Sequence, residues 1–468
     1  MIGRPTKQDK EKFRARLDGG RMAPANGLRP EAKSLFQAHA RLAFEPLSEI
    51  RRVQQDLLTR HLEYTLRHSP YYRGWVSELG LNLDKLWSAE DLSVLPLTDK
   101  RDLARHNQDF QAVSDEKVVD IVFSSGTSGI PTRVVYTERD LQRLAYNEHQ
   151  SMAAAGVGAK DTVLPTCTMD RCFIAGLAYF LGLRSLGAAA VRNGHGTMAG
   201  HQEIIRRLSP SVLVGVPSFL LKLGRYLQAD GVDPSAAGVR TLVCIGEPLR
   251  DRFMQPLPVT EQLQQLWAAT VCSTYASSEI VTTFCECGQQ CGGHLHPDLA
   301  ILEIVDAQGC PLPAGEVGEV VVTPLAVEAM PLLRFRTGDL SMILDEPCPC
   351  GRNTIRLGPI LTRRDQMLKV RGTTLYPGAI AAALDQLPEV EEHYLEVASG
   401  QTLSDQVTVH VAVSGTENGA EKRIVEKLQT CLRVKLEVVV EPLSVIRAQV
   451  FSRNYRKPMR FLDRRKAE

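Results

Sequence analysis

The spacing of apolar and polar residues changes character twice along the chain. Residues 1–115 show mostly helical spacing, as in 47–67, with loop signals at Pro70 and Pro96. From residue 118, short β-branched apolar runs alternate with stretches of helical spacing. This alternation predicts a parallel sheet covered by helices on both faces. The predicted strands are 118–123, 162–165, 188–191, 212–216 and 241–245, and the predicted helices are 138–155, 173–186 and 217–229.

The second change begins near residue 299, where short β-type runs separated by Gly- and Pro-containing turns are typical of antiparallel strands. From residue 366, β-type runs surround two helical stretches, 377–387 and 421–434, which suffices for a compact α+β module. The polar segment 362–366 marks a boundary between the two regions. We therefore predict an α/β chain with a large N-terminal domain (1–361), β-rich over 285–361, and a small α+β C-terminal domain (366–468).

Composition narrows the class of protein. The chain has 468 residues, 44% hydrophobic and 23% charged, which is ordinary for a globular protein. The 55 Lys and Arg residues nearly balance the 54 Asp and Glu residues, so no strong field attracts nucleic acid or an anionic membrane. The apolar run 172–183 is too short to span a bilayer. The basic N-terminus resembles no export or transit signal. The 11 cysteines are therefore expected to be reduced, in a cytoplasmic protein.

A loop rich in glycine and hydroxyl groups follows the first predicted strand. Such a loop can surround a phosphate with backbone N–H groups and hydroxyls, although it lacks the Gly-Lys-Ser/Thr ending of the P-loop. A flexible surface loop would have the same composition. Its residues are Ser124, Ser125, Gly126, Thr127, Ser128 and Gly129, followed by Ile130, Pro131 and Thr132.

Four further strings have weak meaning when each is taken alone. Residues 273–279 suggest a loop with an aromatic ring and a carboxylate, and Asp339 in 336–340 could bind a ribose diol. A surface loop and an ordinary hairpin turn explain these two equally well. The other two are the basic segment 363–372 at the predicted boundary and the basic segment 455–460 near the C-terminus.

Taken in order, the five strings resemble the adenylate-forming superfamily, and most closely its phenylacetate–CoA ligase branch. The phosphate-type loop matches that branch, including Thr132 where most of the superfamily has lysine. Residues 330–339 match its ribose motif, and 367–372 with 375–377 match its domain-crossing segment. The cysteine-rich stretch and the turn 347–352 recur in the same branch.

The resemblance implies that ATP activates a carboxylate as acyl-AMP and that a thiol, most commonly that of CoA, then displaces AMP. It implies that the loop residues Ser124 to Gly129 hold the β- and γ-phosphates. It also implies a Mg²⁺ ligand (Glu279), a ribose ligand (Asp339), a cation near the ribose and phosphates (Arg363), a hinge pivot (Asp365) and a lysine from a mobile C-terminal domain (Lys457). The implied adenine contacts are Gly246, Glu247, Ser273, Thr274 and Tyr275.

One departure from the family concerns the C-terminal lysine. The family usually has glycine before it, whereas Arg456 precedes Lys457 here, and Arg460 follows closely. Either arginine could share the role of Lys457.

The cysteines suggest a metal site. Cys287, His294, Cys348 and Cys350 suit a structural Zn²⁺ ion because thiolates and imidazole are its preferred ligands. Some members of the resembled branch carry zinc at this place. Buried thiols packed as small apolar groups are the plain alternative. Other candidate ligands are Cys285, Cys291 and His296, and Cys172 and Cys272 are weaker candidates for a nucleophile.

The sequence says least about which acid is activated and which molecule accepts the acyl group. The acid pocket is expected near 170–179, 214–219 and 244–246, where Phe173, Tyr179 and Phe219 favour an aryl or arylacetic acid unless they belong to the core. The alternatives to CoA transfer are transfer to a carrier protein or partner enzyme, and a non-catalytic nucleotide-binding or scaffold protein. The oligomeric state is left open, with a homodimer as one option.

Overall fold

The computed structural model describes residues 35–81, 87–124, 132–194, 196–370, 373–399, 404–415, 419–432, 434–451 and 458–465, and the structural statements below concern these residues.

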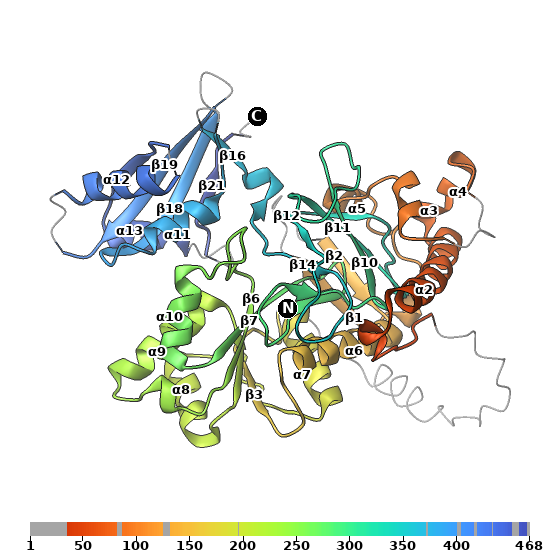
Figure 1. Ribbon diagram of the computed structural model, residues 1–468, viewed down its shortest axis with the longest axis horizontal. Helices are drawn as coiled ribbons and strands as arrows, with labels where there is room; N and C mark the ends of the chain where they lie inside the picture. The colour runs from red at the N-terminus through yellow and green to blue at the C-terminus, as the bar shows by residue number, and fades with distance from the viewer. Residues whose placement is uncertain are drawn as a thin grey trace, which may run out of the picture. The chain divides into compact units, whose positions relative to one another are not determined.

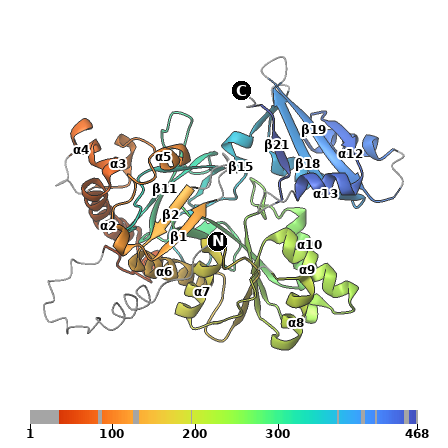
Figure 2. The same ribbon diagram turned by 180° about the vertical axis from the view of Figure 1, so that it is seen from behind.

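The largest sheet combines a parallel and an antiparallel half, in the order β4-β3-β5-β6-β7-β8-β9-β14-β13 (Figures 1 and 2). The strands from β4 to β7 run parallel, and β5 and β6 are mainly apolar on both faces because helices cover both sides. The strands are β3 (Thr162–Pro165), β4 (Ala189–Ala190), β5 (Val212–Gly215), β6 (Thr241–Ile245), β7 (Thr270–Ser277), β8 (Thr282–Glu286), β9 (Gly293–His294), β13 (Ile343–Leu344) and β14 (Arg356–Leu357).

Two groups of helices cover this sheet. One group, α6 (Glu138–Ala154) and α7 (Ile174–Leu186), packs on the face that includes Val212 and Val214. The other, α8 (Met198–Leu208), α9 (Pro217–Ala229) and α10 (Pro258–Trp267), packs on the face that includes Leu213. Helix α6 begins with a reciprocal capping box between Thr137 and Asp140, which fixes its start. The predicted parallel layer with helices on both faces is confirmed.

Two details of the prediction are wrong. Of the expected loop 273–279, residues 273–277 belong to strand β7, because small polar residues facing a cavity hide the usual apolar alternation of a strand. Strand β1 (Asp120–Ser124) pairs antiparallel with β2 (Thr132–Tyr136) and lies outside the parallel sheet. The segment between Ser124 and Thr132 is too short for a parallel crossover, which needs about a dozen residues.

An antiparallel sheet follows, with the order β10-β11-β12-β15. Its strands are β10 (Ala300–Val305), β11 (Gly318–Pro324), β12 (Phe335–Ser341) and β15 (Thr362–Arg363). The register shifts between Glu319 and Val321 opposite residues 337–339, and Gly338 has φ +80°. The Thr-Gly-Asp string is thus a bulge within one strand instead of a hairpin turn between two, and such bulges redirect side chains.

The helices of the N-terminal segment pack against this second sheet. Leu58, Leu62 and Leu66 of α2 share one core cluster with Leu332 and Leu333. The helices are α2 (Leu47–His68), α3 (Pro70–Arg73), α4 (Trp75–Glu78) and α5 (Lys100–Arg105), with short 3₁₀ helices η1 (Leu42–Phe44), η2 (Glu90–Val94) and η3 (Asp115–Lys117). A further 3₁₀ helix, η4 (Pro234–Ala236), follows α9.

The C-terminal part is an α+β unit, as expected. Its sheet has the order β20-β19-β18-β21, with α11 and α12 sharing a core with one face and α13 packing on the other. Its elements are η5 (Arg364–Gln366), β16 (Leu368–Val370), β17 (Thr373–Leu375), α11 (Pro377–Leu384), β18 (Val390–Ser399), β19 (Asp405–Val413), α12 (Ala420–Leu432), β20 (Glu437–Val440), α13 (Leu443–Val450) and β21 (Phe461–Asp463). Helix α13 and strand β21 were not anticipated from the sequence.

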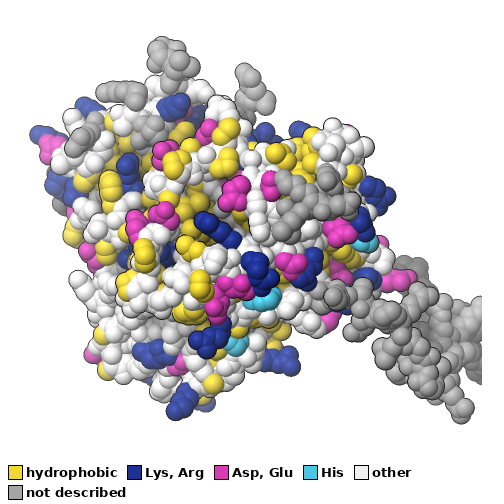
Figure 3. Space-filling view, turned by 45° about the vertical axis from the view of Figure 1, so that its right-hand side comes forward, with side chains coloured by type: hydrophobic (Ala, Val, Ile, Leu, Met, Phe, Trp, Pro, Cys, Tyr) yellow, Lys and Arg dark blue, Asp and Glu magenta, His cyan; other side chains and the backbone are white. Residues whose placement is uncertain are grey.

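The surface carries charges of both signs side by side on the face drawn in Figure 3, in keeping with the formal net charge of +1. None of the helices in the described ranges has both the length and the apolar composition needed to cross a membrane.

Candidate active site

A cavity of about 340 Å³ lies beyond the carboxyl ends of the parallel strands β6 and β7, beside the bulge of β12. Ligands of open α/β sheets bind at this end of the strands. The cavity brings together residues that are far apart in the sequence. The expected site residues along its walls are Gly246, Glu247, Ser273, Thr274, Tyr275, Asp339 and Arg363.

The turn after β6 forms one wall. Gly246 has φ +77°, a backbone conformation that favours glycine. The carboxylate of Glu247 accepts hydrogen bonds from the Ser218 backbone N–H (2.9 Å) and hydroxyl (2.7 Å) at the start of α9. The Glu247 side chain therefore fastens the turn to α9, which leaves backbone atoms as the part of this turn best placed for a ligand.

Strand β7, the neighbour of β6 in the sheet, contributes the next part of the wall. The Ser273 N–H donates to Glu286 Oε2 at 2.8 Å, and the Tyr275 hydroxyl donates to Asp339 Oδ2 at 2.8 Å. Burial, together with the nearby Asp339 carboxylate, raises the pKa of Tyr275 well above its usual value, so the phenol keeps its proton. One face of the cavity thus carries a phenol ring whose hydroxyl is fixed to a carboxylate.

Asp339 is held from two sides. Its second oxygen, Oδ1, lies 3.4 Å from Arg363 Nε, and the two residues are opposite each other in the β12–β15 pairing. The Thr337 hydroxyl accepts from the Asp339 N–H at 3.1 Å within the bulge. The carboxylate is ordered by these contacts and still lies along the cavity.

Glu279 follows β7 and is almost completely buried. Its Oε1 lies 3.0 Å from Lys100 Nζ, and Lys100 lines the same cavity as Asp339. Burial raises the pKa of Glu279, but the Lys100 ammonium together with hydrogen bonds from the Glu279 backbone and from Ser277 outweighs it, and the net shift is downward. Glu279 is therefore ionised at neutral pH. Glu279 itself is not among the residues that line the cavity, but it is joined to the cavity through Lys100.

Lys100 is a site residue that sequence reasoning missed. It is the first residue of α5, whose capping box between Asp99 and Asp102 could have been recognised in the sequence. No spacing rule links it to Glu279, which lies far along the chain. Only the pairing of Thr98 with Phe335 at the edge of β12 brings the start of α5 to the cavity.

Two expected groups fall partly or wholly outside the described residues. The loop residues Ser125, Gly126, Thr127, Ser128 and Gly129 are not described, but Ser124 and Thr132 pair directly across the β1–β2 hairpin and hold both ends of the loop together. Lys457 and Arg456 also lie outside the described residues. Near the expected pivot, Arg465 donates to the backbone carbonyls of Asp365 (2.7 Å) and Met367 (3.0 Å).

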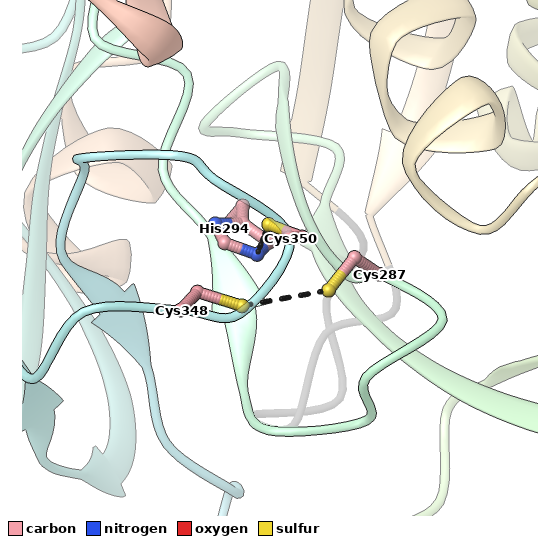
Figure 4. Close-up of side chains that lie close together, drawn as sticks. All are labelled: Cys287, His294, Cys348 and Cys350. Atoms are coloured by element: carbon pink, nitrogen blue, oxygen red, sulfur yellow. Dashed lines mark hydrogen bonds between the residues drawn. The ribbon is translucent and has the colours of Figure 1, made fainter.

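The cysteine cluster assembles as the sequence predicted. Atoms of Cys287, His294, Cys348 and Cys350 that could bind a metal all lie within 4.8 Å of one another (Figure 4). The Cys287 and Cys348 sulfurs are 3.7 Å apart, and His294 Nε2 is 3.4 Å from Cys350 Sγ. Ligands of a tetrahedral zinc ion are separated by about 3.5–3.8 Å, so the four groups fit this ion.

Two of the four groups are in the protonation state that a metal needs, whereas burial raises the pKa of the Cys287 and Cys348 thiols. Burial, with Arg352 nearby, lowers the pKa of His294 to about 3, so the ring is neutral. Burial opposes ionisation of Cys350, but hydrogen bonds from the backbone and side chain of Arg352 outweigh it and lower its pKa. Among the alternative ligands, Cys291 Sγ lies 3.4 Å from Cys348 Sγ, whereas His296 contacts Ser151 and Cys285 packs in the core.

The segments expected to form an acid pocket contribute little to this cavity. Gly246 lines it, but Tyr179 packs in the core between α6, α7 and the sheet, and Phe219 packs edge-on against His201. Tyr179 and Phe219 are therefore core residues, which was the alternative expectation from the sequence. Of the two candidate nucleophiles, Cys172 is exposed, and burial raises the pKa of Cys272 to about 12, so this thiol is not activated.

Comparison with known proteins adds independent information. Residues 35–327 match the model of the AMP-binding enzyme family, and residues 372–465 match that of the AMP-binding enzyme C-terminal domain. The chain belongs to the AMP-binding enzyme family.

Several relatives carry the name phenylacetate-coenzyme A ligase. A phenylacetate-coenzyme A ligase of Thermus thermophilus is 34% identical, covering 79% of this chain and 82% of the relative. A phenylacetate-coenzyme A ligase of Aromatoleum evansii is 29% identical, covering 90% and 96%. Among solved structures, 2-hydroxyisobutyryl-CoA ligase in the postadenylation state superposes with a TM-score of 0.80 at 23% identity over 94% of both chains, which supports the same fold.

Family membership gives the cavity a context. The described residues bring to one cavity a carboxylate beside a guanidinium, an open glycine turn, and a lysine that pairs with a buried carboxylate.

Proposed function

We propose that this protein is an AMP-forming acid–thiol ligase that activates a carboxylic acid with ATP and transfers the acyl group to CoA. In the first step a carboxylate oxygen attacks the α-phosphorus of ATP, the bond to the bridging oxygen breaks, and pyrophosphate leaves. In the second step the CoA sulfur attacks the acyl carbonyl and AMP leaves. The observation that carries the proposal is the convergence of Gly246, Tyr275, Asp339 and Lys100, the partner of Glu279, on one cavity of an AMP-binding enzyme.

The nucleotide would lie between the Gly246 turn and strand β7. The adenine ring would stack on Tyr275 and contact backbone atoms of Gly246 and Glu247, with Ser273 and Thr274 at its edge. Asp339 would accept hydrogen bonds from both ribose hydroxyls, since its carboxylate has lone pairs beyond those used by Tyr275 and Arg363. Arg363 would then face the ribose and the α-phosphate.

The phosphates would lie against the loop from Ser124 to Gly129. Negative charge spreads over the phosphorus oxygens in the transition state, so fixed N–H donors and cations near them lower the barrier. Most of the superfamily has a lysine where this chain has Thr132, so the loop lacks that positive charge. Lys100, whose ammonium lies 3.0 Å from the Glu279 carboxylate, would supply a cation in its place.

Mg²⁺ would bind between the phosphates and Glu279. A single ionised carboxylate is a typical protein contribution to a magnesium–nucleotide site, the remaining ligands being phosphate oxygens and water. Glu279 meets this requirement because its carboxylate is ionised, and the Lys100 ammonium can remain beside it by pairing with a phosphate oxygen. When bound, the metal supplies charge neutralisation on the leaving pyrophosphate.

Lys457 would reach the α-phosphate from a mobile C-terminal domain (366–468) that pivots near Asp365, the N-terminal domain being 1–361. A lysine that leaves after adenylation would free the site for the thiol. Lys457→Ala is then expected to slow acyl-AMP formation by about 10²–10³-fold, the effect of losing one transition-state donor, and to spare thiol attack on preformed acyl-AMP.

The cluster of Cys287, His294, Cys348 and Cys350 would hold a structural Zn²⁺ ion that joins β9, the end of β8 and the turn 348–350. Four protein ligands leave no open position, so the ion would stabilise the fold without taking part in the reaction. Protein purified without chelator should contain about one zinc per chain, in line with a site of four protein ligands. Free thiols of this kind suit the cytoplasm, where we place the protein.

The deciding experiment measures ATP–pyrophosphate exchange with a panel of aryl, arylacetic and fatty acids, followed by addition of CoA. We expect exchange with an aryl or arylacetic acid and acyl-CoA formation once CoA is present. Exchange without acyl-CoA would point to a carrier protein or partner enzyme as acceptor. Absence of exchange with every acid, despite ATP binding, would contradict the proposal and favour a nucleotide-binding scaffold.

A further inference from the structure

Helix α6 buries a row of polar side chains where most helices bury apolar ones. Asp140, Arg143, Asn147 and Glu148 are all at most 2% exposed, and Arg143 is completely buried. Burial lowers the pKa of Arg143 to about 10, so the guanidinium stays charged at neutral pH. Burying a charge destabilises the folded state unless the charged group is fully hydrogen-bonded, so the partners of Arg143 matter.

The Arg143 guanidinium donates to backbone carbonyls from three separate segments and to one hydroxyl. Nε donates to the Leu325 carbonyl at 2.7 Å, and Nη2 donates to the Leu299 carbonyl at 2.6 Å. Nη1 donates to the Val281 carbonyl, and Nη2 also donates to Thr282 Oγ1 at 3.1 Å. A planar fork can reach all of these oxygens at once, which a single ammonium cannot do.

Two of these acceptors, Val281 in the turn that contains Glu279 and Thr282 at the start of β8, lie directly after Glu279 in the chain. Val281 in that turn has φ +48°, an outlier for a β-branched residue. Such a strained conformation persists only where the surroundings impose it. The Arg143 bond to the Val281 carbonyl is one such constraint.

Other buried side chains hold the same turn at its two ends. The Tyr136 hydroxyl donates to the Ser278 carbonyl at 3.0 Å, on the residue before Glu279. Asn147 of α6 accepts from the Thr283 N–H at 3.2 Å. The segment from Ser278 to Thr283 is thus fixed at its start, middle and end, and Glu279 has a fixed starting point for its side chain.

We propose that Arg143 is a positioning residue that fixes the Val281 turn so that the Glu279 carboxylate meets the magnesium–triphosphate group of ATP. This inference rests on the proposed function, because it assigns Glu279 to the metal. Arg143 acts from behind the turn, through Val281 and Thr282, and needs no contact with the nucleotide.

The test compares ATP binding by isothermal titration with Mg²⁺ and with EDTA, in the absence of acid so that no reaction occurs. The ratio of the two affinities reports how well Glu279 meets the metal. In Arg143→Lys and Arg143→Met this ratio is expected to fall about tenfold, the scale of a lost charge-assisted contact. Affinity with EDTA should change much less, because Asp339 and the Gly246 turn are untouched.

Asp140→Asn is the matched control for a general loss of stability. Asp140 lies one turn earlier on α6, is equally buried, and accepts from the N–H groups of Glu328 (2.7 Å) and Ala329 (2.9 Å), away from the Glu279 turn. It should lower the melting temperature but keep the Mg²⁺ ratio. If the Arg143 variants lose stability and keep the ratio as Asp140→Asn does, Arg143 is structural only and the proposal is overturned.

A milder pair covers the case in which the Arg143 variants do not fold. Thr282 and Thr283 are adjacent and buried in β8, but the Thr282 hydroxyl accepts from Arg143 whereas the Thr283 hydroxyl donates to Glu148. Thr282→Val should lower the Mg²⁺ ratio about threefold, the effect of one neutral hydrogen bond, and Thr283→Val should leave it unchanged. Equal ratios in the two variants would overturn the proposal.

The outcomes also separate this inference from the proposed function. Wild-type protein that binds ATP equally well with and without Mg²⁺ would overturn the positioning role directly. A normal Mg²⁺ ratio that responds to Arg143, in a protein that supports no pyrophosphate exchange, would contradict the proposed reaction and leave the positioning role standing.

Discussion

Asp339 and Glu286 are both buried carboxylates beside strand β7 and both line the cavity, but they differ in how fully they are hydrogen-bonded. Glu286 Oε1 accepts from Arg250 Nε (2.9 Å) and the Gly292 N–H (3.2 Å), and its Oε2 accepts from the Ser273 N–H (2.8 Å). Asp339 accepts one short hydrogen bond, from Tyr275, and has a longer contact with Arg363.

The difference shows that the number of unused acceptor positions distinguishes a carboxylate that can bind a ligand from one that only stabilises the fold. Both carboxylate oxygens of Glu286 accept hydrogen bonds from the protein, and these bonds connect β7 to the loop before β9. That loop lies between Cys287 and His294 of the metal cluster. Asp339 keeps acceptor capacity toward the cavity. Variants on the two sides should therefore affect different measurements.

The largest effect is expected on the Glu286 side. Arg250→Met would leave the Glu286 carboxylate buried without its cation, and breaking such a pair costs about 3–5 kcal/mol of stability. Denaturant unfolding should show this loss, while the folded fraction keeps its affinity for ATP within a few-fold. Loss of ATP affinity without loss of stability would assign the Arg250–Glu286 pair to the ligand instead.

The opposite pattern is expected for Asp339→Asn. An amide presents one acceptor where the carboxylate presents two charged oxygens, so the KM for ATP should rise about 10²-fold if two charge-assisted ribose contacts weaken. Stability should change little, because the carboxylate is incompletely used by the protein. A large drop in melting temperature with unchanged KM would erase the distinction between the two carboxylates.

The sequence predicted the general fold because its main signals are local. Apolar runs and turn residues identified the parallel layer and the C-terminal α+β unit. Local signals failed where tertiary contacts determine the secondary structure. The sequence of β7 resembles a loop because Ser273, Thr274 and Ser277 line a cavity. The β12 bulge resembles a turn because Gly338 has a positive φ, which suits a bulge and a turn alike.

The candidate site was predictable to the extent that it is carried by motifs. Gly246, Tyr275, Asp339 and Arg363 lie in recognisable strings, and the four cluster ligands were identified by residue type. Lys100 and Arg143 lie in no string. Each becomes significant only through contacts with residues more than a hundred positions away, which one sequence does not reveal.

The Lys100–Glu279 pair extends the comparison to a third carboxylate, whose ionised form is stabilised by a cation. In Lys100→Met, burial is opposed only by the hydrogen bonds from the Glu279 backbone and from Ser277, so the pKa of Glu279 should rise. In the wild type the Glu279 contribution to stability is present above the ordinary pKa and lost as pH falls through the lowered one. In Lys100→Met, Glu279 becomes protonated at a higher pH, so its contribution to stability is lost at a higher pH than in the wild type.

Two measurements check this expectation for Lys100→Met. The acid limb of the pH profile of pyrophosphate exchange should shift to higher pH, and the KM for Mg·ATP at neutral pH should rise about tenfold from loss of a charge-assisted contact. Lys117→Met, on exposed η3 outside the cavity lining, is a control for removing a positive charge. An unmoved acid limb would show that Lys100 does not set the charge of Glu279.

The smallest effect is expected for Tyr275→Phe, which keeps the ring and removes only the hydroxyl that donates to Asp339. Asp339 would lose one ordering contact and gain acceptor capacity, and these changes act in opposite directions on ribose binding. Because an ordered carboxylate pays less entropy on binding, we expect the ordering loss to prevail, with the KM for ATP rising about threefold. Measuring the KM for ATP and for deoxy-ATP in the same variant checks this reasoning: the increase should shrink for the nucleotide that lacks one ribose hydroxyl. An equal increase for both nucleotides would place the Tyr275 hydroxyl in contact with another part of ATP.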